Sequence, residues 1–254
     1  MTRVHQRDVR TFVDLEALSQ AAAKEIVDVA RASATARGRF SLALSGGNTP
    51  KRTYQLLVER YRDAIDWGKI DIVFGDERFV AREDPRSNYR MAREAFLASA
   101  PVPAERVYAV PTDVPTVDDA AQGYERTLRR VLAPDAAGTA TIDLVLLGVG
   151  PDGHTASLFP GSPALDERER WVSAVAAPTT VQPAVPRVTV TLPFLNGARH
   201  VVFLVAGADK RPVIGQILGD ATSARRYPAA MVAPVGRSLW MIEQSAMPPA
   251  EPNA

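Results

Sequence analysis

Short, almost uninterrupted apolar runs alternate with helix-like segments along the first 150 residues of this chain. The runs cover residues 40–44, 70–74 and 142–147, and a glycine follows each within two residues. Strands without alternating polar residues are typical of parallel sheets, because helices cover both faces of such sheets. The alternation therefore predicts an α/β protein with a doubly wound, mostly parallel sheet flanked by helices, similar to Rossmann folds.

The second half of the chain has a different strand pattern. Four further runs resemble strands: residues 171–176, 187–192, 201–205 and 239–242. One convincing helix lies among them, beginning near Ala208, so some of these strands are expected to form a small flanking β subdomain. We expect one α/β domain over residues 1–246 and a loose tail over 247–254, since the proline-rich tail suits neither helix nor ladder.

Helix boundaries are marked by capping residues. Side chains suited to an N-cap stand at Asp14, Thr49, Ser87 and Thr116. The helix after Asp14 is expected to stop near Gly38, and the one after Ser87 to run through residue 97. With Thr49 as N-cap, the following proline occupies the first helical position, which proline favours. Residues 75–86 are expected to form a polar loop.

Composition excludes several classes of protein. The 254 residues carry a formal net charge of +1 and include no cysteine. No basic block with interleaved aromatics indicates binding to nucleic acid or a membrane surface. Without cysteine, disulfides, thiolate chemistry and cysteine zinc sites are excluded. The N-terminus has no apolar signal region and no run of about 18 apolar residues occurs, so we expect a soluble, cytoplasmic protein.

A glycine pair follows the first apolar run and leads into a helix. The segment reads Ser45-Gly46-Gly47-Asn48-Thr49-Pro50. Glycines allow backbone N–H groups to approach an anion, and a helix N-terminus adds unpaired donors and partial positive charge. The segment resembles a phosphate cradle. A tight strand-to-helix turn with an ordinary cap explains the same residues equally well.

Three charged residues follow the second apolar run directly, in Gly75-Asp76-Glu77-Arg78-Phe79. Charges at the carboxyl end of a parallel strand commonly line a binding site. The planar guanidinium of Arg78 suits a phosphate, a carboxylate or charge developing on an oxygen. Taken alone, an exposed cluster of mutually compensating charges is the simpler interpretation.

The third apolar run ends in a glycine turn that carries Asp152 and His154. The chain has three histidines. His5 lies in a terminus expected to fray, and His200 stands beside an arginine at the start of a strand, where a structural role is expected. His154 is therefore the candidate general base, because imidazole changes protonation near neutral pH. Asp152 is suited to hold the ring in the required tautomer.

Two further cations lie at ends of apolar strands. Arg187 begins one strand, and Lys210 falls in the first turn of the helix expected near residue 208. A cation in the first turn is opposed by the helix dipole unless an anion is present. A bound phosphate would explain both placements, although surface lysine and arginine are common.

Other reaction classes have little support. One isolated histidine and scattered carboxylates do not have the spacing of a zinc site, so no metal is expected. Gly161-Ser162-Pro163 lacks the strand, turn and helix of a nucleophile elbow. Water is then the expected nucleophile. No Walker sequence or Gly-x-Gly-x-x-Gly motif indicates a nucleotide.

Together these motifs resemble those of the 6-phosphogluconolactonases in the glucosamine-6-phosphate deaminase-like superfamily. The resemblance covers almost the whole chain, in the order Leu44 to Pro50, Gly75 to Arg78 with Ser87-Asn88-Tyr89, Gly148 to Gly161, Arg187, and Gly207 to Lys210. The glycine turn is shared by the superfamily, whereas its continuation Thr-Ala-Ser-Leu-Phe-Pro is more specific to lactonases.

The resemblance implies hydrolysis of 6-phospho-D-glucono-1,5-lactone to 6-phosphogluconate in the oxidative pentose phosphate pathway, without a cofactor. It implies that His154 activates water, that Asp152 orients His154, and that Arg78 lies near the lactone oxygens. It implies a substrate site that holds the phosphate and sugar: Ser45, Gly46, Gly47, Thr49, Asp76, Arg187 and Lys210. The partner is a sugar-phosphate lactone, with no nucleic acid and no membrane, and the oligomeric state stays open.

Two rival functions fit the same fold. Amino-sugar phosphate deaminases or isomerases resemble Gly-His-Ile-Ala-Phe-Asn-Glu at this turn and use the glutamate five residues after the histidine. Phe159 stands there in this chain, and a phenyl ring cannot move protons. A non-catalytic sugar-phosphate sensor would keep the cradle but should carry a DNA-binding appendage, and residues 1–13 are too few for a helix-turn-helix.

Overall fold

The central element is a parallel β-sheet. The computed structural model describes residues 7–136, 138–219 and 226–249. Within these residues, neighbouring strands pair in parallel in the order β1 (Asp8–Phe12), β9 (Arg237–Glu243), β8 (His200–Val205), β5 (Leu144–Leu147), β2 (Phe40–Leu44) and β3 (Ile70–Phe74). Every residue of β2, β3 and β5 is buried, as the apolar runs predict.

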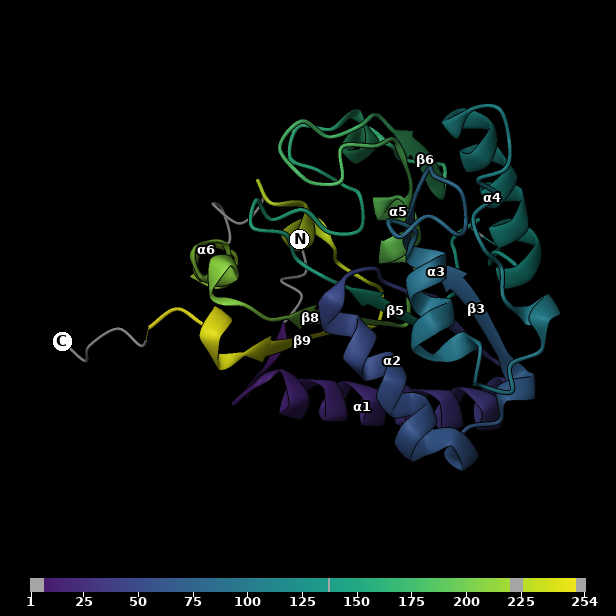
Figure 1. The fold of residues 1–254 in the computed structure, drawn as a ribbon, viewed down its shortest axis with the longest axis horizontal. Helices are drawn as coiled ribbons and strands as arrows, with labels where there is room; N and C mark the ends of the chain where they lie inside the picture. The colour runs from purple at the N-terminus through teal and green to yellow at the C-terminus, as the bar shows by residue number, and fades with distance from the viewer. Residues whose placement is uncertain (1–6, 137, 220–225, 250–254) are drawn as a thin grey trace.

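Helices flank this sheet (Figure 1). They are α1 (Leu15–Arg37), α2 (Asn48–Tyr61), α3 (Asn88–Ala92), α4 (Val117–Leu132), α5 (Leu192–Asn196), α6 (Arg211–Gly219) and α8 (Pro228–Met231). Helix α1 packs along α2 and against β1, β2 and β9. A π-helical turn, Arg93–Leu97, continues α3, and 3-10 turns occupy Arg62–Ala64, Trp67–Lys69, Ala104–Arg106, Pro163–Asp166, Ala208–Lys210 and Gln244–Ala246. The predicted fold class is confirmed.

A second, antiparallel sheet flanks the first, in the order β4 (Asp76–Arg78), β7 (Arg187–Val190) and β6 (Val172–Val175). It is the small β unit expected from the later strands, and α4 packs against β6 and β7 (Figure 1). The prediction of a loop over residues 75–86 is wrong at its start. Three polar residues there form β4, because β7 supplies hydrogen-bonding partners more than 100 positions away. The single-domain organisation stays a prediction.

Most helix starts agree with the expected caps. Asp14 accepts a hydrogen bond from the Ala17 N–H at 2.7 Å, and Gly38 follows α1 in the left-handed region. Ser87 and Thr116 likewise cap α3 and α4. The prediction for Thr49 is wrong, since Gly47 is the N-cap and α2 begins at Asn48, two residues before the expected start at Pro50. Gly47 has φ +98°, a conformation that favours glycine, so the turn closes before Thr49.

The structure near the N-terminus contains a strand that the sequence does not predict. Strand β1 was not foreseen, because its residues are mostly exposed and it pairs only with β9 at the sheet edge. His5 and residues 250–254 of the expected tail lie outside the described residues. In the described part of the chain, no helix has the length and hydropathy to cross a membrane.

The order of the strands creates a crevice. From β2 the chain adds β3 on one side, and then crosses back to add β5, β8 and β9 on the other side. The direction of addition therefore reverses between β2 and β5. Ligands of open α/β sheets bind outside the carboxyl ends of the strands at such a point. Both glycine turns singled out in the sequence follow these two strands.

Candidate active site

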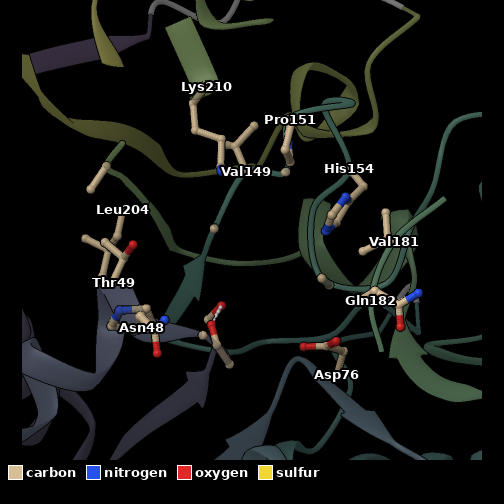
Figure 2. A pocket seen from close by; sticks show the side chains of 18 of the residues that line it. Asn48, Thr49, Asp76, Val149, Pro151, His154, Val181, Gln182, Leu204 and Lys210 are labelled. Atoms are coloured by element: carbon tan, nitrogen blue, oxygen red, sulfur yellow. Dashed lines mark hydrogen bonds between the residues drawn. The ribbon is translucent and has the colours of Figure 1, made fainter. Parts of the chain in front are cut away.

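A pocket of about 430 Å³ opens at this crevice. Nine of the ten residues selected from the sequence line it: Ser45, Gly46, Gly47, Thr49, Asp76, Arg78, His154, Arg187 and Lys210. Figure 2 shows His154 and Lys210 pointing toward the same space, with Thr49 and Asp76 on its other side. The tenth, Asp152, contacts His154 directly. Residues from five separate parts of the chain thus line one pocket.

The N-terminus of α2 forms one wall of the pocket. No side chain caps this helix, so its first backbone N–H groups remain available on the pocket side. The buried Tyr54 hydroxyl fixes the turn, because it accepts from the Ser45 N–H and donates to the Ser45 carbonyl, both at 2.9 Å. Burial raises the pKa of Tyr54, which keeps this hydroxyl protonated. The wall is suited to an anion.

His154 is held by Asp152 on the opposite wall. Asp152 Oδ1 lies 2.5 Å from His154 Nδ1 and also accepts from the His154 backbone N–H at 3.1 Å. Burial alone would raise the pKa of Asp152, but the hydrogen bond and charge of His154 outweigh burial and hold that pKa below its usual value. An ionised Asp152 keeps the proton on Nδ1, so Nε2 is the nitrogen that can accept a proton.

The turn around His154 depends on a close approach of backbone to side chain. A Cβ at Gly150 would lie 2.1 Å from Nδ1 and Cε1 of His154 and 2.8 Å from Oδ1 of Asp152. Real Cβ atoms essentially never lie within 3.0 Å of a non-bonded atom. Gly150 is therefore required for the observed His154 position, a requirement that only the three-dimensional structure makes visible.

Arg78 and Arg187 stand directly opposite each other on β4 and β7. Like charges in that position repel. The Nε atoms of both are buried, and neither has a hydrogen-bond partner within the described residues. The remaining contacts are Arg78 Nη1 to the Arg86 carbonyl at 2.7 Å and Arg187 Nη2 to the Pro183 carbonyl at 3.0 Å. Burial lowers the pKa of Arg187. An anion between the two would relieve the repulsion and satisfy the donors.

The acidic residues of β4 are not an exposed cluster. Asp76 and Glu77 are 6% and 2% exposed. Glu77 accepts from the backbone N–H groups of Arg78, Asn88 and Tyr89, each at 2.7 Å. Burial raises the pKa of Glu77. Glu77 therefore fastens the start of α3 to β4 and fixes the backbone of Arg78.

Asp76 is positioned by two side chains that sequence reasoning gave no role. Ser157 Oγ donates to its carboxylate at 2.7 Å, and Asn88 Nδ2 donates to it at 3.2 Å and to its backbone carbonyl at 2.9 Å. Both residues belong to the motifs of the resemblance, but spacing alone could not place them beside Asp76. The Asp76 carboxylate, which lines the pocket, is thus held in a fixed orientation.

The remaining wall comes from the later part of the chain. Lys210 lies in the 3-10 turn Ala208–Lys210, just before α6, and forms an ion pair with Asp209. Val181 and Gln182 line the pocket from the connection between β6 and β7. No sequence pattern marked these two residues. Among the described residues, no group of three or more histidine, aspartate and glutamate side chains could hold a metal ion.

Comparison with known proteins gives a consistent result. A profile of the glucosamine-6-phosphate isomerases/6-phosphogluconolactonase family matches residues 13–240. A 6-phosphogluconolactonase from Synechocystis is 41% identical over 210 residues, or 83% of this chain and 84% of that protein. One from Nostoc is 39% identical with the same coverage.

A solved structure agrees with the sequence relatives. The 6-phosphogluconolactonase from Trypanosoma cruzi superposes with a TM-score of 0.83 and is 32% identical, covering 95% of this chain and 96% of that one. The matched segment contains both glycine turns, β4, Arg187 and Lys210. This chain therefore belongs to the glucosamine-6-phosphate isomerase/6-phosphogluconolactonase family.

Proposed function

We propose that this protein hydrolyses 6-phospho-D-glucono-1,5-lactone to 6-phosphogluconate, a step of the oxidative pentose phosphate pathway. One observation carries the proposal. An imidazole held by a carboxylate faces the same pocket as two opposed arginines with unpartnered buried donors. The pocket therefore offers a base for water and a site for an anion. The names of the relatives point to the same reaction.

The reaction follows from the roles of His154 and Asp152. Water attacks the lactone carbonyl carbon while Nε2 of His154 accepts one of its protons. The carbonyl electrons move onto oxygen, where Arg78 stabilises the charge. The intermediate then collapses, the bond to the ring oxygen breaks, and that oxygen receives the proton from His154. Asp152 holds the imidazole in its tautomer and stabilises the imidazolium between the two proton transfers.

The phosphate does not react, but its binding places the carbonyl. The α2 N-terminus with Ser45, Gly46, Gly47 and Thr49 holds it together with Arg187 and Lys210, and Asp76 accepts from sugar hydroxyls. Binding energy from a remote group fixes the reacting atoms relative to the base and so raises turnover as well as affinity.

Lys210→Ala is expected to raise KM for the lactone roughly tenfold or more, the effect of losing a charged hydrogen bond to phosphate. The value of kcat should change less than KM, because the α2 N-terminus and Arg187 still hold the phosphate and keep the carbonyl in place. Steady-state kinetics on fresh lactone measures both constants. Lys69→Ala is the matched control, since Lys69 also pairs with a neighbouring aspartate but lies outside the pocket. Equal KM in the two variants would contradict a role for Lys210 in phosphate binding.

An amino-sugar phosphate deaminase is the nearest rival, and Phe159 argues against it. The position that carries glutamate in the deaminase pattern holds a buried phenyl ring 4.8 Å from the His154 ring, between centroids. No proton-transferring group stands there. A sensor is disfavoured because a binding module has no need for the ordered His154 and Asp152 pair.

Two activity assays and one binding measurement on the same preparation distinguish the three functions. Acid release is followed with fresh 6-phosphogluconolactone, and ammonia release with glucosamine 6-phosphate. The lactonase accelerates the first and releases no ammonia. Ammonia release would establish the deaminase, and binding without either reaction would establish the sensor. The cytoplasmic location and the absence of a cofactor stay predictions.

A further inference from the structure

Phe159 packs against two residues that line the pocket: His154, the candidate base, and Arg187, a candidate phosphate-binding cation. Its ring centroid lies 4.8 Å from that of His154, at an interplanar angle of 50°, and the Arg187 guanidinium carbon lies over the same ring at 5.4 Å. The ring is 9% exposed and is not among the residues that line the pocket. One buried side chain therefore touches the base and a cation that belong to different elements.

The segment that carries Phe159 is fixed at several points. Thr155 Oγ1 donates to the Gly148 carbonyl at 2.8 Å, and the Ser157 N–H donates to Thr189 Oγ1 at 3.1 Å. Ala156 has φ +48°, which is uncommon for a residue with a Cβ. Strain of this kind persists only where the surroundings impose it. The ring is thus part of a rigid frame that also holds Asp76 through Ser157.

A ring has a physical advantage over a charged partner at this position. It attracts the guanidinium through its face and leaves the N–H donors free. A carboxylate would pair with Arg187, neutralise it and occupy those donors. Among the residues described, the Arg187 guanidinium makes one hydrogen bond, to a backbone carbonyl, so most of its N–H donors remain for a ligand. Packing against His154 similarly leaves Nε2 free, because Asp152 takes Nδ1.

We propose that Phe159 is a positioning residue that holds the His154 imidazole and the Arg187 guanidinium in one fixed arrangement before the substrate binds. This inference rests on the proposed function, in which His154 activates the water that attacks the carbonyl and Arg187 binds the phosphate. The ring sets the distance between base and anion site and so contributes to selection of a substrate whose phosphate and carbonyl match that distance.

Phe159→Leu keeps an apolar side chain but removes the aromatic face. We expect KM for the lactone and Kd for 6-phosphogluconate to rise about 2- to 30-fold, the contribution of a cation–π contact. We expect kcat to fall roughly tenfold, because a displaced base loses its alignment with water. Phe159→Tyr retains the face and should restore most of both constants. Phe194→Leu is the matched control, since this buried ring packs on Trp171 and lies outside the pocket.

Proton NMR of the histidine rings separates positioning from general destabilisation. The chain has three histidines, so the His154 signals can be assigned with one variant. The ring current of Phe159 should displace the His154 signals in the wild type, and Phe159→Leu should remove that displacement. Unchanged His154 signals, or a fall in kcat with KM and Kd unchanged, would overturn the proposal. A wild type without lactonase activity would refute the proposed function instead, while the NMR and 6-phosphogluconate binding measurements would still report on the ring.

Discussion

Replacing His154 with alanine is expected to lower kcat for 6-phosphogluconolactone by roughly 10²–10⁴-fold, the contribution of a placed general base. Alanine cannot accept the proton of the attacking water, and Asp152 lies on the far side of the missing ring. KM should change little, because the residues proposed to hold the phosphate are other residues that line the pocket. Initial rates on fresh lactone, corrected for spontaneous hydrolysis, measure both constants.

His200→Ala is the matched control for this substitution. His200 begins β8, and it is absent from the pocket lining. Its removal should leave kcat and KM near their wild-type values. Near-normal turnover in His154→Ala would show that another group activates the water, and the assignment of the base would then be wrong.

Gly150→Ala is expected to reduce kcat roughly 100-fold or more with little loss of thermal stability, because a catalytic group displaced by about 1 Å loses activity on that scale. The added Cβ would overlap the His154 ring, with 2.1 Å to two of its atoms. A side chain can swing aside where backbone cannot, so the fold survives while the imidazole leaves its position against Asp152. Kinetics and a thermal melt on the same sample measure the two effects.

Gly148→Ala in the same turn is the control for Gly150→Ala. A Cβ at Gly148 would meet only Ser45 Oγ, at the ordinary contact distance of 3.9 Å. Its kcat should stay close to that of the wild type because the imidazole is untouched, and any effect should fall on KM, since Gly148 lines the pocket beside Ser45. If both variants were equally active, the close packing of Gly150 on the imidazole would have no catalytic importance. If both were equally impaired, the loss would reflect the turn as a whole.

The fold was predictable where burial determines the residue type. Strands β2 and β3 have the bounds expected from their apolar runs, since strands covered on both faces tolerate few polar residues. Strand β4 has no such signal. Its residues are polar, and their burial depends on partners in β7 and α3 that are distant in the sequence.

The same distinction holds for the pocket. Residues such as His154 and Lys210 were predictable because they follow strands whose carboxyl ends meet at one edge of a parallel sheet. Ser157 and Asn88 were not, because their function is to hold Asp76 through contacts that span many residues. Thr49 shows a third limit. The unusual backbone of Gly47 starts α2 two residues before the position that the capping preference of Thr49 indicates.

The most direct test is the initial rate of 6-phosphogluconate formation from freshly prepared 6-phosphogluconolactone, with wild-type protein and His154→Ala at equal concentration beside the spontaneous reaction. Fresh substrate is essential because the lactone hydrolyses unaided. We expect the wild type to exceed the spontaneous rate by a wide margin and the variant to approach it. A wild-type rate equal to the spontaneous one would contradict the assignment of this pocket to lactone hydrolysis.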